Sequence, residues 1–414
     1  MARKMKDSGI EWIGEIPEGW EIGQIGQLYS ERRTKVSDKD YPPLSVTMKG
    51  ILPQLSTAAK TDAHDDRKLV CKGDFAINSR SDRRGSCGIS EQDGSISLIN
   101  TVLQPRGEMN PGYYNWLFHT SMFADEFYKW GHGIVDDLWT TGWSDMKKIG
   151  VPVPSKCEQK QLAGYLNVEC SHIDSILSKT RASIEEYKKL KQAVITQALT
   201  KDICDNFGNP SKFRKLRSLC DVLSKGTTPK DIETQNDEFY CIRYLKSENI
   251  VSNQLDLNPT FFITAETNNS LERSKLNSGD ILFVIAGASI GKVAIATADF
   301  LPANTNQAVA FIRLSSSYQY ATKYIWYFLQ SDVVKQLIAL SAVQSAQPNL
   351  SLEDLGAMRL PLPDQMGCLK ITNYLDTKCA EIDKLIAKKE QLVKELENYK
   401  KSLIYEVVTG KREV

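Results

Sequence analysis

Three features are scarce in this 414-residue sequence: paired cysteines, histidines and long apolar runs. The nine cysteines include no Cys-x-x-Cys pair, and only four histidines are present, so neither a zinc ribbon nor a disulfide framework is indicated. No apolar run approaches the roughly 20 residues of a membrane-spanning helix, and residues 1–20 lack the apolar core of a signal peptide. We therefore expect reduced thiols and a cytoplasmic location.

An excess of positive charge is also missing. Residues 1–150 contain 19 Lys and Arg against 21 Asp and Glu, and residues 202–360 contain 15 against 16. Proteins that bind nucleic acid nonspecifically usually carry a domain-wide positive excess, because neutralised phosphates supply most of that affinity. Any contact with nucleic acid must therefore depend on local patches or be shared with a partner.

Metal-binding and catalytic motifs are weak. The best metal candidate is the cluster Asp62, His64, Asp65 and Asp66, for which a solvated loop is the favoured interpretation. Residues 287–292 (GASIGK) resemble a phosphate-binding loop, but one residue is missing and a valine follows where magnesium needs Ser or Thr. Residues 41–44 (YPPL) resemble the methyltransferase Asn-Pro-Pro-Tyr loop without the groups that hold a flipped base. We predict no catalytic residue and no metal site.

An internal repeat is the strongest feature that is present. Residues 152–200 align without gaps to residues 361–409, a shift of 209. A second match upstream pairs Gly73 with Gly279 and Gly85 with Gly291 at a shift of 206. Continuing at that shift places Asn100 on Asn306, which favours a role in the scaffold for this shared residue. The repeat predicts the order domain, helix, domain, helix.

The two repeated helical stretches are predicted to pair. Their apolar residues recur at alternating spacings of three and four, which is typical of a helix that packs along a seam. Ser155 with Glu158 forms a capping-box pattern, Asp364 can cap the second helix, and Gly410 marks a natural end. The residues expected to pair are Ile173, Ile176, Ile184, Tyr187, Val194, Ile382, Leu385, Leu392, Leu396, Tyr399 and Leu403.

The length of these helices suggests that they are spacers. About forty residues at a rise of 1.5 Å make each helix on the order of 60 Å long. We expect two long antiparallel helices that form a coiled coil and separate two globular domains. Two separate helical hairpins, each with a partner protein, remain the alternative.

The globular copies are predicted to be α+β domains of mixed strands and helices. Short apolar runs such as 75–77 and 281–285 lie between Gly, Asn and Ser turns, which indicates strands. Aromatic residues at helical spacing in 112–130 and 318–340 indicate helices that bury them in the core. The predicted segments are domain 1 at 1–154, spacer helix 1 at 155–201, domain 2 at 202–363 and spacer helix 2 at 364–414.

Several stretches together resemble the specificity subunit of type I restriction-modification systems. They are DSGIEWIGEIPEGWE at 7–21, the GDILF to GASIGKV segment at 279–293, and the VPVP and LPLP entries at 151–154 and 360–363. The resemblance covers nearly the whole chain. It implies two target-recognition domains held apart by paired helices, each domain reading one half of a split site in double-stranded DNA.

The resemblance also implies partners and cofactors. Adenine-methyltransferase subunits, two of them, would carry the S-adenosylmethionine chemistry, and a motor-nuclease subunit would use ATP and magnesium. No cofactor is then expected in this chain. The rival interpretations are a stand-alone DNA methyltransferase or nuclease, and a coiled-coil scaffold that does not bind DNA.

Polar turns of the two domains are where DNA contacts are expected. Arginine forks match guanine edges or phosphates, and Asn or Gln amides match adenine. The candidates are Lys49, Arg80, Ser81, Arg83 and Arg84 in domain 1, and Arg243, Lys246, Ser289, Lys292, Asn306 and Gln307 in domain 2. A solvated surface charge is the alternative for each basic residue, and a turn former for Asn306.

Two further features bear on DNA binding. The arginines at 80, 83 and 84 occupy the region that contains residues 285–290 in the second copy, a divergence expected if two half-sites differ. Residues 131–143 and 341–350 precede the two helices, and their Gly, Thr, Ser, Gln and Asn content suits a flexible loop along a DNA backbone. A plain connector is the alternative for both loops.

Overall fold

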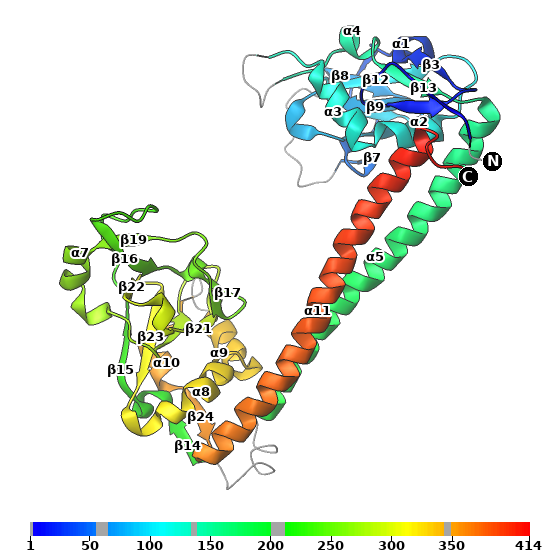
Figure 1. The fold of residues 1–414 in the computed structure, drawn as a ribbon. Helices are drawn as coiled ribbons and strands as arrows, with labels where there is room; N and C mark the ends of the chain where they lie inside the picture. Colours follow the sequence, from blue (N-terminus) through cyan, green and yellow to red (C-terminus); the bar gives the residue numbers. More distant parts are fainter. Residues whose placement is uncertain (1–2, 55–64, 134–138, 200–211, 343–348) are drawn as a thin grey trace. The chain divides into compact units, whose positions relative to one another are not determined.

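The computed structural model describes residues 3–54, 65–133, 139–199, 212–342 and 349–414. The chain divides into two compact units: Met1–Arg181 with Glu390–Val414 (unit 1), and Ala182–Lys389 (unit 2). Each unit therefore holds one globular domain and a part of each long helix, α5 (Lys156–Ala198) and α11 (Gln365–Val408), as Figure 1 shows.

Unit 1 is built on a four-stranded antiparallel sheet of order β10-β9-β12-β4. Unit 1 also contains a three-stranded sheet of order β11-β8-β5 and the β6–β7 hairpin. These strands are β4 (Tyr29–Glu31), β5 (Lys35–Val36), β6 (Leu44–Thr47), β7 (Gly50–Pro53), β8 (Arg67–Val70), β9 (Phe75–Asn78), β10 (Cys87–Ile89), β11 (Gly94–Ile96) and β12 (Asn100–Pro105).

Two short helices, α2 (Pro111–Phe118) and α3 (Ser121–Lys129), pack aromatic side chains into the core of unit 1. The ring of Phe118 lies 4.8 Å from that of Phe75 and 4.6 Å from that of Phe123, between centroids. The side chain of Asn110 caps α2, and that of Thr120 caps α3. Phe118, Phe123 and Phe127 are therefore core residues, as predicted, whereas Trp116 and Trp130 are half-buried and pack against the core.

Unit 2 repeats this plan with a four-stranded antiparallel sheet of order β15-β23-β20-β21. Its three-stranded sheet has the order β19-β16-β22, with β16 and β22 parallel. The strands are β15 (Cys220–Lys225), β16 (Tyr240–Leu245), β19 (Phe262–Thr264), β20 (Ile281–Val284), β21 (Val293–Ile295), β22 (Ala303–Thr305) and β23 (Val309–Leu314). Helices α8 (Thr322–Leu329) and α9 (Asp332–Ala342) follow, as α2 and α3 do in unit 1.

Smaller elements frame both sheets. In each unit, the last strand before the long helix pairs with a strand that opens the domain, β13 with β3 in unit 1 and β24 with β14 in unit 2. Their bounds and those of the other short elements are β1 (Met5–Asp7), β2 (Glu15–Pro17), β3 (Glu21–Gln24), α1 (Ile25–Leu28), α4 (Trp143–Met146), β13 (Gly150–Val153), β14 (Lys212–Lys215), β17 (Ile250–Val251), β18 (Gln254–Leu255), α7 (Ala265–Ser270), α10 (Leu352–Ala357) and β24 (Arg359–Leu362).

The internal repeat and the α+β fold class are confirmed. The strand order β10-β9-β12-β4 of unit 1 corresponds to β21-β20-β23-β15 of unit 2. The turn before the central strand is the same in both copies, because the N–H of Gly73 donates to Ser90 O and that of Gly279 to Ala296 O, each at 2.8 Å. Both glycines have a positive φ, +89° and +87°, which disfavours a side chain there.

One detail of the repeat alignment is wrong. Asn100 does not correspond to Asn306, because the N–H of Asn100 donates to Ser97 O at 3.1 Å just as the N–H of Val309 donates to Asn306 O at 3.2 Å. Ser97 is therefore the counterpart of Asn306, and the shift changes from 206 to 209 between β21 and β23. The argument that a shared asparagine belongs to the scaffold no longer applies to Asn306.

Both long helices begin at the predicted caps. The N–H of Ser155 donates to the Glu158 carboxylate at 3.2 Å, and the N–H of Glu158 lies 3.4 Å from Ser155 Oγ, which completes the capping box. The Asp364 carboxylate accepts the N–H of Gly367 at 2.7 Å. Gly410, with φ +73°, follows the end of α11. No helix in the described ranges is long and apolar enough to cross a membrane.

The helices pair antiparallel within each unit, as predicted. In unit 1, Asp174 binds Lys400 at 2.6 and 2.7 Å, and Arg181 pairs with Glu397, so the partner numbers fall as α5 advances. In unit 2, Lys191 binds Asp383 at 2.8 and 2.6 Å. The two Asp–Lys pairs occupy repeat-equivalent positions, because both members differ by 209.

The seam differs from the prediction at four positions. Ile176, Leu385, Leu392 and Tyr399 are exposed. Their neighbours Leu177, Ile386, Val393 and Lys400 continue the heptad spacing and are buried or half-buried. The other predicted pairing residues are buried or half-buried: Ile173, Ile184, Tyr187, Val194, Ile382, Leu396 and Leu403.

Candidate nucleic-acid interface

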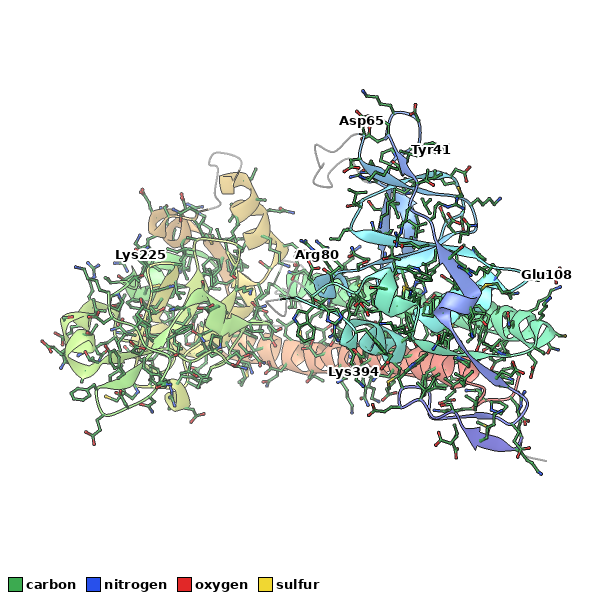
Figure 2. The ribbon with its side chains drawn as sticks, turned by 90° about the horizontal axis from the view of Figure 1, so that it is seen from above. Tyr41, Asp65, Arg80, Glu108, Lys225 and Lys394 are labelled. Atoms are coloured by element: carbon green, nitrogen blue, oxygen red, sulfur yellow. The ribbon has the colours of Figure 1, made fainter. Side chains whose placement is uncertain are left out.

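Four of the predicted DNA-contacting residues of unit 1 lie in one loop, between β9 and β10. Arg80, labelled in Figure 2, opens the loop, and a short turn of 3-10 helix (Ser81–Arg83) follows. The N–H of Arg80 donates to the Asn78 side chain at 3.0 Å, and the N–H of Ser81 donates to Trp139 O at 2.9 Å. The structure therefore brings Arg80, Ser81, Arg83 and Arg84 together on a fixed backbone, with the three arginine side chains exposed.

Lys49, the fifth candidate of unit 1, lies at the exposed tip of the β6–β7 hairpin beside the exposed Met48. The hairpin crosses β10 at Gly88, where a Cβ would lie only 2.7 Å from the Cα of Gly50. A larger residue at 88 would push the hairpin away. The Gly50–Gly88 contact therefore joins the hairpin to the strand that leaves the arginine loop.

The equivalent loop of unit 2 lies between β20 and β21 and has a different character. Ala286 pairs with Asn349 through a bridge, as Arg80 pairs with Thr140. Residues 286–291 carry no charge, and both glycines of the loop, Gly287 and Gly291, have φ +87°. Of the predicted residues, Ser289 and Lys292 both lie in this loop, Lys292 as its last residue before β21. The N–H of Lys292 donates to Ser289 O at 3.2 Å.

Asn306, Gln307 and Lys246 form a second group in unit 2. The N–H of Asn306 donates to Leu245 O at 3.2 Å, which joins the turn after β22 to the end of β16. The side chain of Asn306 accepts the N–H of Ala308 at 3.2 Å, so this residue is also the turn former of the alternative interpretation. Gln307 is exposed.

Two basic candidates of unit 2 have partners within their own domain. The Arg243 guanidinium donates to Asp299 O at 2.5 Å. The Lys246 ammonium lies 3.4 Å from the ring centroid of Phe261, a cation–π contact. The sequence could not reveal these partners, because both are distant along the chain.

Lys335 and Gln192 were not singled out from the sequence, yet they line a surface pocket of unit 2 together with Lys292. The Lys335 ammonium donates to Gln192 Oε1. Lys335 belongs to α9 and Gln192 to α5, so only the fold brings these groups next to Lys292.

Some predictions fall partly outside the described residues. Of the candidate metal cluster, Asp62 and His64 lie outside the described ranges, and the described residues contain no group of three or more potential metal ligands. Of the predicted loops at 131–143 and 341–350, residues 134–138 and 343–348 lie outside those ranges as well. Within the first loop, Thr141 donates its hydroxyl to Phe127 O at 2.8 Å, which joins the end of the loop to α3.

Glu158 joins the start of α5 to the N-terminal segment of unit 1. Its carboxylate accepts hydrogen bonds from Trp20 Nε1 at 3.1 Å and from the Ser155 hydroxyl at 2.7 Å, and it pairs with Arg3. Partial burial acts to raise the pKa of Glu158, but these hydrogen bonds outweigh it and bring the pKa to about 2. The IPEGW stretch at 16–20 is thus tied to the helix entry.

Residues 209–395 match the family model for the type I restriction modification DNA specificity domain. This part of the chain is therefore similar to the DNA specificity domain of that family. The type I restriction enzyme EcoBI specificity subunit of Escherichia coli is 25% identical over 279 residues, which cover 63% of this chain and 58% of the relative. The EcoKI specificity subunit of E. coli strain K12 is 22% identical over 307 residues, covering 68% and 64%. The chain spans about three-fifths of the length of these relatives.

Two solved structures share the fold of this chain. One comes from a study of complex assembly and conformational transition of the type I R-M system; it has a TM-score of 0.74 at 12% identity over 96% of this chain and 99% of that chain. The HsdS subunit from Thermoanaerobacter tengcongensis has a TM-score of 0.52 at 15% identity over 96% and 98%. At these identities the likeness concerns the fold alone.

Proposed function

We propose that this chain selects the DNA sequence on which a type I restriction-modification complex acts, and that each unit reads one half of a bipartite site. The observation that carries the proposal is the contrast between two equivalent loops. The β9–β10 loop presents Arg80, Arg83 and Arg84, whereas residues 286–291 of the β20–β21 loop are uncharged. One scaffold with two different surfaces suits two different half-sites.

The proposed partners are two adenine-methyltransferase subunits, which carry S-adenosylmethionine, and a motor-nuclease subunit, which uses ATP and magnesium. In this proposal α5 and α11 set the gap between the half-sites and dock the methyltransferase subunits. Several large apolar side chains of the two helices lie outside the seam and are exposed, among them Ile176, Leu385 and Leu392. Exposed apolar side chains of this kind favour a protein partner that binds the helices.

Methylome sequencing of cells with and without the gene tests the proposal. We expect one bipartite adenine-methylation motif to disappear when the gene is deleted and to return when the full chain is expressed again. Unchanged methylation would contradict the proposal. DNA cleavage or methylation by the purified chain alone would instead favour a stand-alone enzyme.

A further inference from the structure

The three arginines of the β9–β10 loop have different surroundings. The Arg84 guanidinium forms an ion pair with the Asp125 carboxylate at 2.8 Å and lies 5.5 Å from the ring centroid of Tyr128. Asp125 and Tyr128 both belong to α3, the helix that also supplies Phe123 to the core. Arg84 therefore connects the end of the β9–β10 loop to α3, a helix that is anchored in the core by Phe123.

The side chain of Tyr128 also contacts the β9–β10 loop. Its side chain is only 2% exposed, and its hydroxyl lies 3.1 Å from Asn78 O and 3.3 Å from Arg83 O. Burial raises the pKa of the Tyr128 hydroxyl, which therefore remains a donor at neutral pH. One buried side chain thus reaches the backbone on both sides of Arg80, while its ring faces Arg84.

Arg80 and Arg83 are held by their backbones and leave their guanidinium groups to the solvent side. The N–H of Arg83 donates to Arg80 O at 3.2 Å. The Arg83 guanidinium lies 3.7 Å from the carboxylate of Asp82, a longer contact than the 2.8 Å between Arg84 and Asp125. Among the described residues, Arg80 has no carboxylate partner.

We propose that Arg80 and Arg83 are the arginines of this loop that contact DNA, and that Arg84 is a positioning residue that acts with Asp125 and Tyr128. This inference rests on the proposed function. An arginine already bound to Asp125 would have to give up that ion pair to bind DNA, and would leave the carboxylate facing phosphates. A loop that is ordered before binding loses less entropy when it binds.

The equivalent loop of unit 2 supports this division of roles. Its residues 286–291, which correspond to 80–85 of unit 1, carry no charge. The loop also lies against α9, since a Cβ on Gly291 would be 2.9 Å from the Cδ1 of Ile338. Three arginines within five residues repel one another, so the loop of unit 1 needs a carboxylate to fasten it. Asp125 supplies that carboxylate.

A charge swap distinguishes positioning from contact. The variants of the full chain are Arg80→Ala, Arg83→Ala, Arg84→Ala, Tyr128→Phe and the double variant Arg84→Asp with Asp125→Arg. The matched control is Lys129→Ala, which removes an exposed charge from the last residue of α3 without touching the loop. Each is expressed in the deletion strain and scored for methylation of the motif. Each variant is then purified in complex with the proposed methyltransferase subunits. Its affinity is measured by titration with a DNA duplex that carries the motif mapped by methylome sequencing.

We expect Arg80→Ala and Arg83→Ala to weaken binding about 5- to 100-fold and to relax discrimination in one half-site only. Arg84→Ala and Tyr128→Phe should weaken binding of the same half-site by a smaller factor. The swap should return affinity to within about threefold of the wild type, because it restores the ion pair with the charges exchanged. Lys129→Ala should bind like the wild type.

A swap variant as weak as Arg84→Ala, with an unchanged melting temperature, would overturn the inference, because Arg84 would then contact DNA itself. Wild-type affinity of Arg80→Ala and Arg83→Ala would overturn it too. Failure of the proposed function has a different signature, since methylation would then be independent of the chain in every strain, wild type included.

Discussion

Arg32 binds Asp74 through two hydrogen bonds, from Nε at 2.6 Å and from Nη2 at 3.1 Å. Asp280, the counterpart of Asp74 in unit 2, is bound in the same two-pronged way by Arg313, at 2.8 and 2.7 Å. The two arginines are not counterparts, because Arg32 follows β4 whereas Arg313 lies in β23. The carboxylates of Asp74 and Asp280 are equivalent in the repeat, but the arginines that neutralise them come from different positions of it.

We expect this ion pair to be essential for the stability of unit 1. Arg32→Ala would leave the buried Asp74 carboxylate without its cation, and breaking a buried pair in this way costs about 3–5 kcal/mol. Arg33→Ala is the matched control, because the Arg33 side chain is exposed. Its expected effect on the free energy of unfolding is below about 0.5 kcal/mol. Denaturant titration measures both, and equal effects would contradict the prediction.

The hydrogen bonds of Glu158 make stability depend on acid pH. Because the folded-state pKa of about 2 lies below the ordinary value of 4.5, the stabilisation is complete above pH 4.5 and is lost as the pH falls toward 2. Glu158→Gln should therefore lower stability at pH 7 and flatten its dependence on pH in that window. Parallel pH curves for the variant and the wild type, from unfolding titrations, would refute this assignment.

Two isoleucines of α5 that lie three residues apart, Ile173 and Ile176, test the register of the seam. Ile173 is 5% exposed and Ile176 is 47% exposed. Ile173→Ala should therefore cost about 2–4 kcal/mol of unfolding free energy, and Ile176→Ala less than about 1 kcal/mol. If the exposed apolar positions dock a methyltransferase subunit, Ile176→Ala should instead reduce the partner retained in co-purification. A larger stability loss at Ile176 would contradict the observed register.

Lengthening the helix pair tests its role as a spacer. Seven residues inserted after Arg181, with seven more after Lys389, preserve the heptad pattern and add about 10 Å of helix. At about 3.4 Å per base pair, the gap of the methylated motif should grow by roughly three base pairs while both half-sites keep their bases. Methylome sequencing reads the motif directly. Altered half-site bases with an unchanged gap would contradict the spacer role.

The arginine loop combines what a sequence can and cannot reveal. Its position within the repeat and its difference from residues 286–291 were visible, because both follow from comparing the two copies. Which arginine is fastened to α3 was not visible. Asp125 lies 41 residues after Arg84, and only the packing of α3 against the sheet brings them together.

The sequence by itself determined the duplication, the two long helices with their caps, and the antiparallel pairing that one chain with both copies allows. These features are local or periodic, so neighbouring residues suffice to specify them. The tertiary structure alone decided whether Ile176 or Leu177 enters the seam, since both are apolar and only the facing helix selects between them. It also decided that Ser97 matches Asn306, because strand register is set by hydrogen bonds between distant segments.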